Sequence, residues 1–100
     1  MQQIYLQSKL YEELIEWAKQ CGVKKIVLFG SRARGDNKER SDIDIAISGG
    51  NVAEFITGID EQINTLLMFD VIHLDGAMQS ELRDVIEKEG IVIYEKAREF

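Results

Sequence analysis

Residues 25–47 read KIVLFGSRARGDNKERSDIDIAI, and the organisation of the rest of the chain follows from them. The first five of these residues are an apolar run of the length of a buried strand. Gly30 comes next, and a glycine lets the backbone turn tightly and approach a ligand closely. Ser31 is a favourable N-cap for a short helix that runs through Ala33. Because free N–H groups at a helix start attract phosphate, this turn is a candidate phosphate site.

Two arginines and two aspartates in this stretch are candidate ligand-binding residues. Arg32 and Arg34 could each form charge-assisted bonds with a phosphate, or one or both could simply be solvated. After a polar loop, residues 42–48 alternate with the period of two that is typical of a strand. The alternation places Asp42 and Asp44 on one face of that strand and its isoleucines on the other. Two carboxylates on one face repel each other, and a cation between them relieves the repulsion.

The paired carboxylates have two interpretations. Carboxylate oxygens, together with a phosphate-binding turn just upstream, indicate a Mg²⁺ ion that carries a nucleotide. The simpler interpretation is a solvated strand edge with a polar loop before it. A lone Asp-x-Asp favours the simpler interpretation. The Gly30-Ser31 turn, one loop upstream and directly after an apolar strand, favours the metal site.

The spacing of Gly30-Ser31 and Asp42-x-Asp44 resembles the signature of the DNA polymerase β-like nucleotidyltransferases. The fuller pattern, GSRARG followed by SDID, is similar to that of the minimal nucleotidyltransferases, and the resemblance covers nearly the whole chain. It implies an α/β (α+β) fold of the polymerase β-like nucleotidyltransferase type, with a small mixed β-sheet flanked by helices. It also implies that residues 1–100 form a single minimal nucleotidyltransferase domain.

A third carboxylate, Asp70, is the one charge inside the apolar run of residues 69–74. Strand interiors disfavour aspartate, and a buried one needs a partner, such as a neighbour that caps it at a strand end. In the family that the chain resembles, a third metal-site carboxylate lies on a later strand beside the Asp-x-Asp strand. The resemblance therefore implies that the catalytic and metal-binding triad is Asp42, Asp44 and Asp70. It further implies a nucleotide-binding set that consists of Gly30, Ser31, Arg32 and Arg34.

The activity that the resemblance implies is transfer of AMP from ATP to a hydroxyl with two Mg²⁺ ions. One ion, held by Asp42 and Asp44, would bind the triphosphate, and a second, shared with Asp70, would lower the pKa of the acceptor hydroxyl. In the minimal family, the acceptor typically belongs to a separate helical HEPN protein, and such pairs resemble toxin–antitoxin modules. The chain would then be an antitoxin that adenylylates a tyrosine of a HEPN RNase toxin and forms a hetero-oligomer with it. The alternative is a non-catalytic antitoxin subunit that binds and masks the HEPN partner.

Composition limits the partners and the location of the chain. Its 100 residues are 45% hydrophobic and 30% charged, which is ordinary for a globular protein. The net charge of −6 argues against broad, non-specific nucleic-acid binding, which needs a basic surface. No apolar run approaches membrane-spanning length, and the N-terminus does not resemble a signal peptide. The one cysteine, Cys21, excludes an internal disulfide and fits a reducing cytoplasm.

Helical periodicity and glycine breaks predict the other elements. An apolar stripe predicts a first helix over residues 3–21, ended by Gly22. Asn51 and Glu54 predict a capping box that opens a second long helix, whose apolar face continues to Leu67.

Further along, residues 78–89 have the pattern of a last helix and residues 91–94 that of a closing strand. Such an alternation of short strands and amphipathic helices is typical of a layered fold. We expect the three aspartates on one face of the sheet and the helices on the other. Gly58, inside the second long helix, costs about 1 kcal/mol relative to alanine, and the sequence gives no reason for it.

Overall fold

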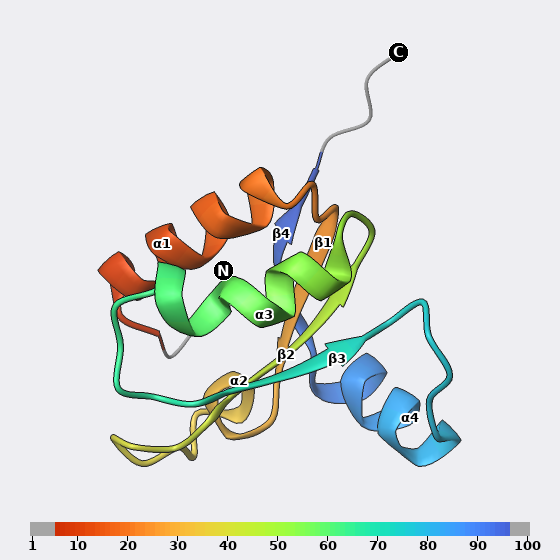
Figure 1. Ribbon diagram of the computed structural model, residues 1–100. Helices are drawn as coiled ribbons and strands as arrows, with labels where there is room; N and C mark the ends of the chain where they lie inside the picture. Colours follow the sequence, from red (N-terminus) through yellow and green to blue (C-terminus); the bar gives the residue numbers. More distant parts are fainter. Residues whose placement is uncertain (1–5, 97–100) are drawn as a thin grey trace.

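The computed structural model describes residues 6–96, which form a four-stranded sheet and four helices (Figure 1). The elements in chain order are α1 (Ser8–Gln20), β1 (Lys25–Phe29), α2 (Ser31–Arg34), β2 (Ile43–Ser48), α3 (Val52–Gln62), β3 (Phe69–His73), α4 (Ser80–Glu89) and β4 (Ile91–Glu95). The strand order is β3-β2-β1-β4. Since β1 is antiparallel to both of its neighbours and β2 is parallel to β3, the sheet is mixed, as predicted.

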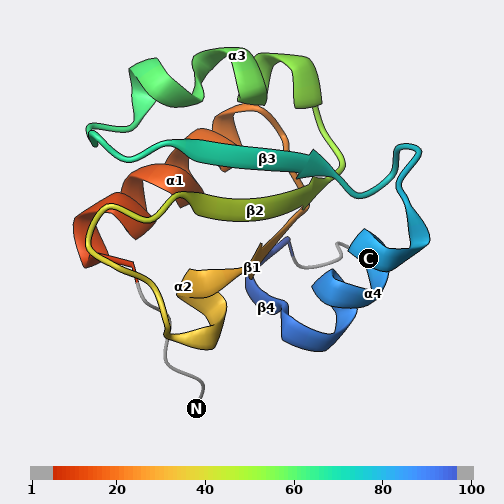
Figure 2. The same cartoon turned by 90° about the horizontal axis from the view of Figure 1, so that it is seen from below.

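The alternation along β2 sends its side chains to two different cores. Ile43, Ile45 and Ile47 are fully buried in the main core, which α1 and α3 cover. Asp44 and Ala46 face the other side, where Ala46 belongs to a smaller core under α4. Figure 2 shows α1 and α3 on one side of the sheet and α2 and α4 on the other.

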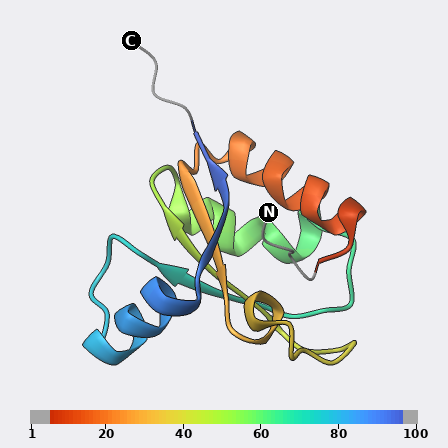
Figure 3. The same cartoon turned by 180° about the vertical axis from the view of Figure 1, so that it is seen from behind.

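The expectation that the helices avoid the aspartate face is therefore wrong in part. The row next to the aspartates on that face consists of apolar residues from three strands, Val27, Ala46 and Ile72, and α4 covers this row with Ile86. Figure 3 shows α4 packed across this side of the sheet, with α2 beside it. Asp44 and Asp70 lie on the same face, in the row next to the one that Ile86 covers.

Contacts between α1 and α3 account for the unexplained glycine. The indole N–H of Trp17 donates a buried hydrogen bond of 3.0 Å to the carbonyl oxygen of Phe55. A Cβ at Gly58 would overlap the indole ring. The close packing of Trp17 against Gly58 thus offsets the free-energy cost of a glycine inside a helix. Tyr11 joins the same helix to the sheet, since its hydroxyl donates to the carbonyl oxygen of Ile93 at 2.6 Å.

The starts of α1 and α4 differ from their predicted positions. Residues 3–5 of the predicted first helix lie outside the described part of the chain. The helix α1 begins at Ser8, because the preceding Gln7 has an extended backbone (φ −64°, ψ 142°). The helix α4 begins at Ser80 rather than at residue 78, again after a residue with an extended backbone.

The long central helix is shorter than its apolar pattern predicts. Its start is confirmed: the Asn51 side chain accepts from the Glu54 amide at 3.1 Å and donates to the Glu54 carboxylate at 3.1 Å. Its end lies at Gln62, because the chain turns at an extended Ile63 to bring β3 alongside β2. Leu67 therefore lies in a loop. No helix within residues 6–96 has the length and apolar character that a membrane crossing requires.

Candidate functional site

Asp44 and Asp70 are direct neighbours across the parallel pair of strands. Asp44 of β2 is in register with Asp70 of β3, and the residue opposite Asp44 on β1 is Phe29. Paired positions on adjacent strands point to the same face of a sheet. The two carboxylates therefore lie side by side on one face, with Asp44 half-buried and Asp70 exposed.

Asp42 lies one residue before β2, which begins at Ile43 rather than at residue 42 as predicted. Its exposed carboxylate still acts on Asp44. Burial is the largest cause that raises the pKa of Asp44, and repulsion from Asp70 and Asp42 raises that pKa further. The nearby cation of Arg34 opposes these effects. The three predicted carboxylates thus form one electrostatic group at the open end of the aspartate face.

The Gly30 turn runs directly against the Asp44 carboxylate. Gly30 has φ 75° and ψ −156°, and a Cβ there would overlap the carboxylate of Asp44. Gly30, and not Ser31, is the N-cap of α2, because the Gly30 carbonyl accepts the first helical hydrogen bonds. Ser31 is instead the first residue of the helix. Within residues 6–96 its hydroxyl has no hydrogen-bond partner, so it is free to bind a ligand.

Arg32 is buried rather than solvated. Only 6% of the residue is exposed. Its guanidinium donates to the carbonyl oxygen of Ser41 at 3.0 and 3.2 Å and to that of Glu39 at 3.1 Å. These contacts tie α2 to the loop that leads into Asp42. Its contacts make Arg32 a positioning residue, and direct binding of a nucleotide by Arg32 stays a prediction.

Arg34 lies at the edge of the site and connects it to α4. Its guanidinium donates to Asp36 at 3.0 Å and to Glu89 at 2.8 Å. These two carboxylates raise the pKa of Arg34. Sequence analysis missed Glu89, because its partner lies 55 residues away and no local pattern links them.

The site offers the ligand chemistry that Mg²⁺ requires, although the side chains are not gathered around one point. Within the part of the chain that the structure describes, no group of three His, Cys, Asp or Glu side chains is arranged to hold a metal ion. The donor set is three carboxylates, which are hard oxygen ligands of the type that Mg²⁺ prefers, and two of them are exposed. Asp42, Asp44 and Asp70 therefore fit a magnesium site by their chemistry.

Carboxylates on neighbouring strands, beside a glycine–serine turn with a free hydroxyl, are suited to binding a metal–nucleotide complex and transferring part of it. The fold and the site thus define a protein of the nucleotide-transferring class. A family model described as "Polymerase beta, Nucleotidyltransferase" matches residues 12–99. The chain belongs to this family.

One curated relative matches part of the chain. It comes from Methanocaldococcus jannaschii, is named "Putative protein adenylyltransferase MJ0604", and is 44% identical over 59 residues. The match covers 59% of this chain and 56% of the relative. The matched segment thus spans about half the length of that relative.

Solved structures share the fold at low sequence identity. A toxin–antitoxin structure with AMP-PNP has a TM-score of 0.68 and 22% identity, covering 86% of this chain and 73% of its own. A structure of the toxin–antitoxin MntA-HpeT has a TM-score of 0.66 and 20% identity, with the same coverage. At these identities the likeness establishes the fold alone.

Proposed function

We propose that the chain transfers AMP from ATP to a hydroxyl group of a partner protein. The observation that carries the proposal is the pairing of Asp44 with Asp70 against the Gly30 turn. Membership of the nucleotidyltransferase family supports the reaction type. The name of the M. jannaschii relative supports a protein as the acceptor, and the presence of AMP-PNP with one structural neighbour supports an adenine nucleotide.

Each residue of the site has a separate role in the proposed reaction. Asp42, Asp44 and Asp70 would hold two Mg²⁺ ions, which would neutralise phosphate charge and lower the pKa of the acceptor hydroxyl. The Ser31 hydroxyl and the Gly30 backbone would contact the β and γ phosphates. The acceptor oxygen would bond to the α-phosphorus while the bond from that phosphorus to pyrophosphate breaks. Asp70, the exposed member of the strand pair, would take the proton that the acceptor hydroxyl loses.

The partner that we propose is a helical HEPN RNase toxin, with a tyrosine as the acceptor. The two structural neighbours described above are toxin–antitoxin structures, and this likeness supports a partner of this kind. Attachment of AMP would add charge and bulk to the toxin and so neutralise it in the cytoplasm. The alternative is an antitoxin that neutralises the toxin by binding alone, within a hetero-oligomer.

The test uses ATP labelled at the α-phosphate, Mg²⁺ and a small helical protein, to be sought as the product of a neighbouring gene. We expect wild type to label a tyrosine of that protein. The variant Asp44→Asn should be slower by at least about 100-fold, because it removes charge stabilisation worth several kcal/mol. The matched control is Asp60→Asn, which changes an exposed aspartate on α3 and should label like wild type.

Two outcomes would contradict the proposal. Labelling by Asp44→Asn at a rate close to wild type would exclude the carboxylate site. Full neutralisation of the toxin by an Asp44→Asn variant that transfers no AMP would favour the binding alternative.

A further inference from the structure

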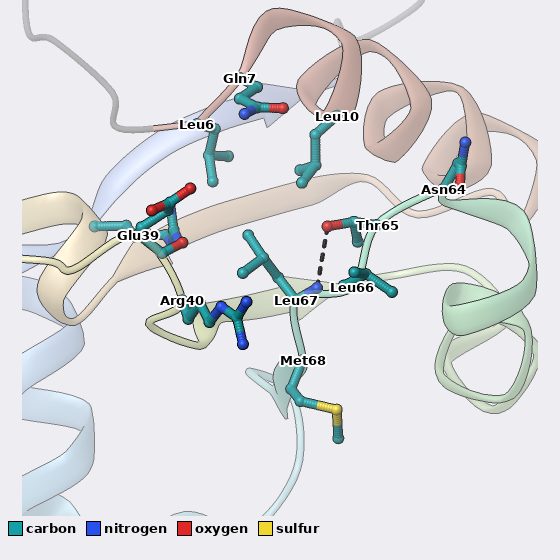
Figure 4. A pocket seen from close by; sticks show the side chains of 11 residues that line it. Leu6, Gln7, Leu10, Glu39, Arg40, Asn64, Thr65, Leu66, Leu67 and Met68 are labelled. Carbon is teal, nitrogen blue, oxygen red and sulfur yellow. Dashed lines mark hydrogen bonds between the residues drawn. The ribbon is translucent and has the colours of Figure 1, made fainter.

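An open groove of about 640 Å³ lies at the edge of the sheet where β2 and β3 begin (Figure 4). One wall comes from Leu6, just before α1, and from Leu10 in the first turn of α1. The opposite wall comes from the loop that contains Leu66, Leu67 and Met68. In Figure 4, the side chains of Leu6, Leu10 and Leu67 surround a common space.

The loop that forms one wall is unusually apolar for an exposed segment. Leu66 is fully exposed, at 101% relative accessibility, and Met68 is 64% exposed. Single exposed apolar residues are common, but Leu66 and Met68 lie in one loop beside a groove that is lined by both apolar and polar side chains, and such a patch is a candidate interaction surface.

The groove shares its two loops with the carboxylates. Arg40 lines the groove two residues before Asp42, and Met68 lines it two residues before Asp70. Two residues of extended chain span only about 7 Å. The two loops are joined by a hydrogen bond of 2.9 Å from the Ile43 amide to the Met68 carbonyl. The groove and the aspartates thus lie on opposite faces at the same end of β2 and β3, and a protein docked in the groove would reach Asp70 around the start of these two strands.

Charge and position indicate what occupies the groove. The chain has a net charge of −6, yet the charged side chains that line the groove are two arginines, Arg32 and Arg40, and one glutamate, Glu39. Within residues 6–96, no carboxylate forms an ion pair with Arg40. Since the Arg32 guanidinium is buried and bonds to the carbonyl oxygens of Ser41 and Glu39, Arg40 is the cation that a ligand can reach, and the groove favours a ligand that has apolar groups and a negative charge.

The same observations disfavour the other occupants. A second copy of this chain would bring a net charge of −6 and its own Arg40 to the contact. A nucleotide bound at the Gly30 turn would lie on the aspartate face. It would not fill the groove, because the groove residues Leu10 and Leu67 belong to the main core on the opposite face.

We propose that this groove, lined by Leu6, Leu10, Leu66, Leu67 and Met68, is the docking surface for the acceptor protein. An apolar side chain of the acceptor enters the groove, and an acidic side chain beside it pairs with Arg40. The acceptor hydroxyl is thereby held next to Asp70. This inference rests on the proposed function and names the surface that selects its substrate.

The probe that tests the groove is a displayed library of random short peptides, selected on the wild-type chain. We expect the selected peptides to combine apolar and acidic residues. Their binding to the double variant Leu66→Ser/Met68→Ser should be at least about tenfold weaker, as for central residues of an interface. Arg40→Gln should weaken the acidic peptides specifically. The matched control Ile56→Ser, which changes a 44% exposed residue on α3, should bind them like wild type.

Three outcomes of the binding experiments would overturn the docking surface. In the first, the wild-type chain selects no peptides. In the second, the selected peptides bind the double variant as tightly as wild type. In the third, the wild-type chain forms a dimer and the double variant is a monomer. With the neighbouring-gene protein as acceptor, the double variant should raise KM about tenfold at unchanged kcat, and an unchanged KM would also overturn the surface. Peptide binding through Leu66 by a chain that transfers no AMP would instead overturn the proposed function and leave the surface in place.

Discussion

Removal of the Asp44 charge should stabilise the protein when no metal is bound. Asp44 is half-buried, lies beside Asp70 across the strand pair, and follows Asp42 by two residues. It accepts no hydrogen bond from the described residues that would favour its charged form. The variant Asp44→Asn removes the charge and keeps the shape that fits against Gly30.

The size of the effect follows from these neighbours. Favourable cross-strand pairs contribute roughly 0.2–1 kcal/mol, and like charges at directly opposed strand positions are destabilising. Asp42 and partial burial add to that cost, and Arg34 offsets part of it. We expect Asp44→Asn to be more stable than wild type by about 1 kcal/mol, which corresponds to roughly 4–8 °C in Tm for a domain of this size.

The pH dependence gives the prediction its sign. Because the pKa of Asp44 is raised on folding, the group favours folding while it is protonated, and that contribution is lost as pH rises through the folded-state pKa. The two proteins should therefore be equally stable below the ordinary aspartate range, and the variant should gain its advantage above that range.

Thermal melts in EDTA between about pH 3 and pH 7 measure this difference, with Asp60→Asn as the control for removal of any one charge. Addition of Mg²⁺ and a non-hydrolysable ATP analogue should reverse the ranking, because only wild type binds the complex tightly and gains stability by mass action. The reasoning is refuted if Asp44→Asn melts below wild type in EDTA, or if its advantage is the same at every pH.

Three other changes test the structure elsewhere. Gly58→Ala should destabilise the protein by about 1–3 kcal/mol, because the new Cβ overlaps the Trp17 ring. Chemical denaturation should show a smaller loss of stability for Gly58→Ala in a Trp17→Phe background. Equal losses in the two backgrounds would contradict the contact. Hydrogen bonds from Ser48 and the Gly49 amide lower the pKa of Asp75. An NMR titration of the Asp75 carboxyl should therefore have its midpoint below the ordinary aspartate range, and Ser48→Ala should raise that midpoint. Arg32→Lys should raise the KM for ATP and speed proteolysis of residues 35–42, because a lysine ammonium is a point charge on a flexible stem and lacks the rigid fork that holds the carbonyl oxygens of Ser41 and Glu39. Unchanged proteolysis would exclude the positioning role.

Local patterns predicted the parts of the site that lie close together in sequence. The apolar run of β1, the glycine turn and the alternation around Asp44 are all properties of one continuous stretch, and β1 spans the predicted residues. The position of Asp70 beside Asp44 depends on how α3 returns the chain to the sheet, so sequence alone could not provide it, and a family resemblance was needed. The period of α4 indicated its apolar stripe but not the sheet face that the stripe covers. The Arg34–Glu89 pair links two segments with no common pattern.

The place of β3 at the margin of the sheet has a consequence for the dynamics of the protein. β3 hydrogen-bonds to β2 on one side only, whereas β1 and β2 are each paired on both sides. Strands with fewer partners open more often in local fluctuations that leave the rest of the fold intact. Asp70 is carried by this strand, so each such opening would withdraw one carboxylate from the other two. A ligand that binds all three carboxylates would then slow amide hydrogen exchange in β3 far more than in β1, and binding at the site would also order the edge of the sheet.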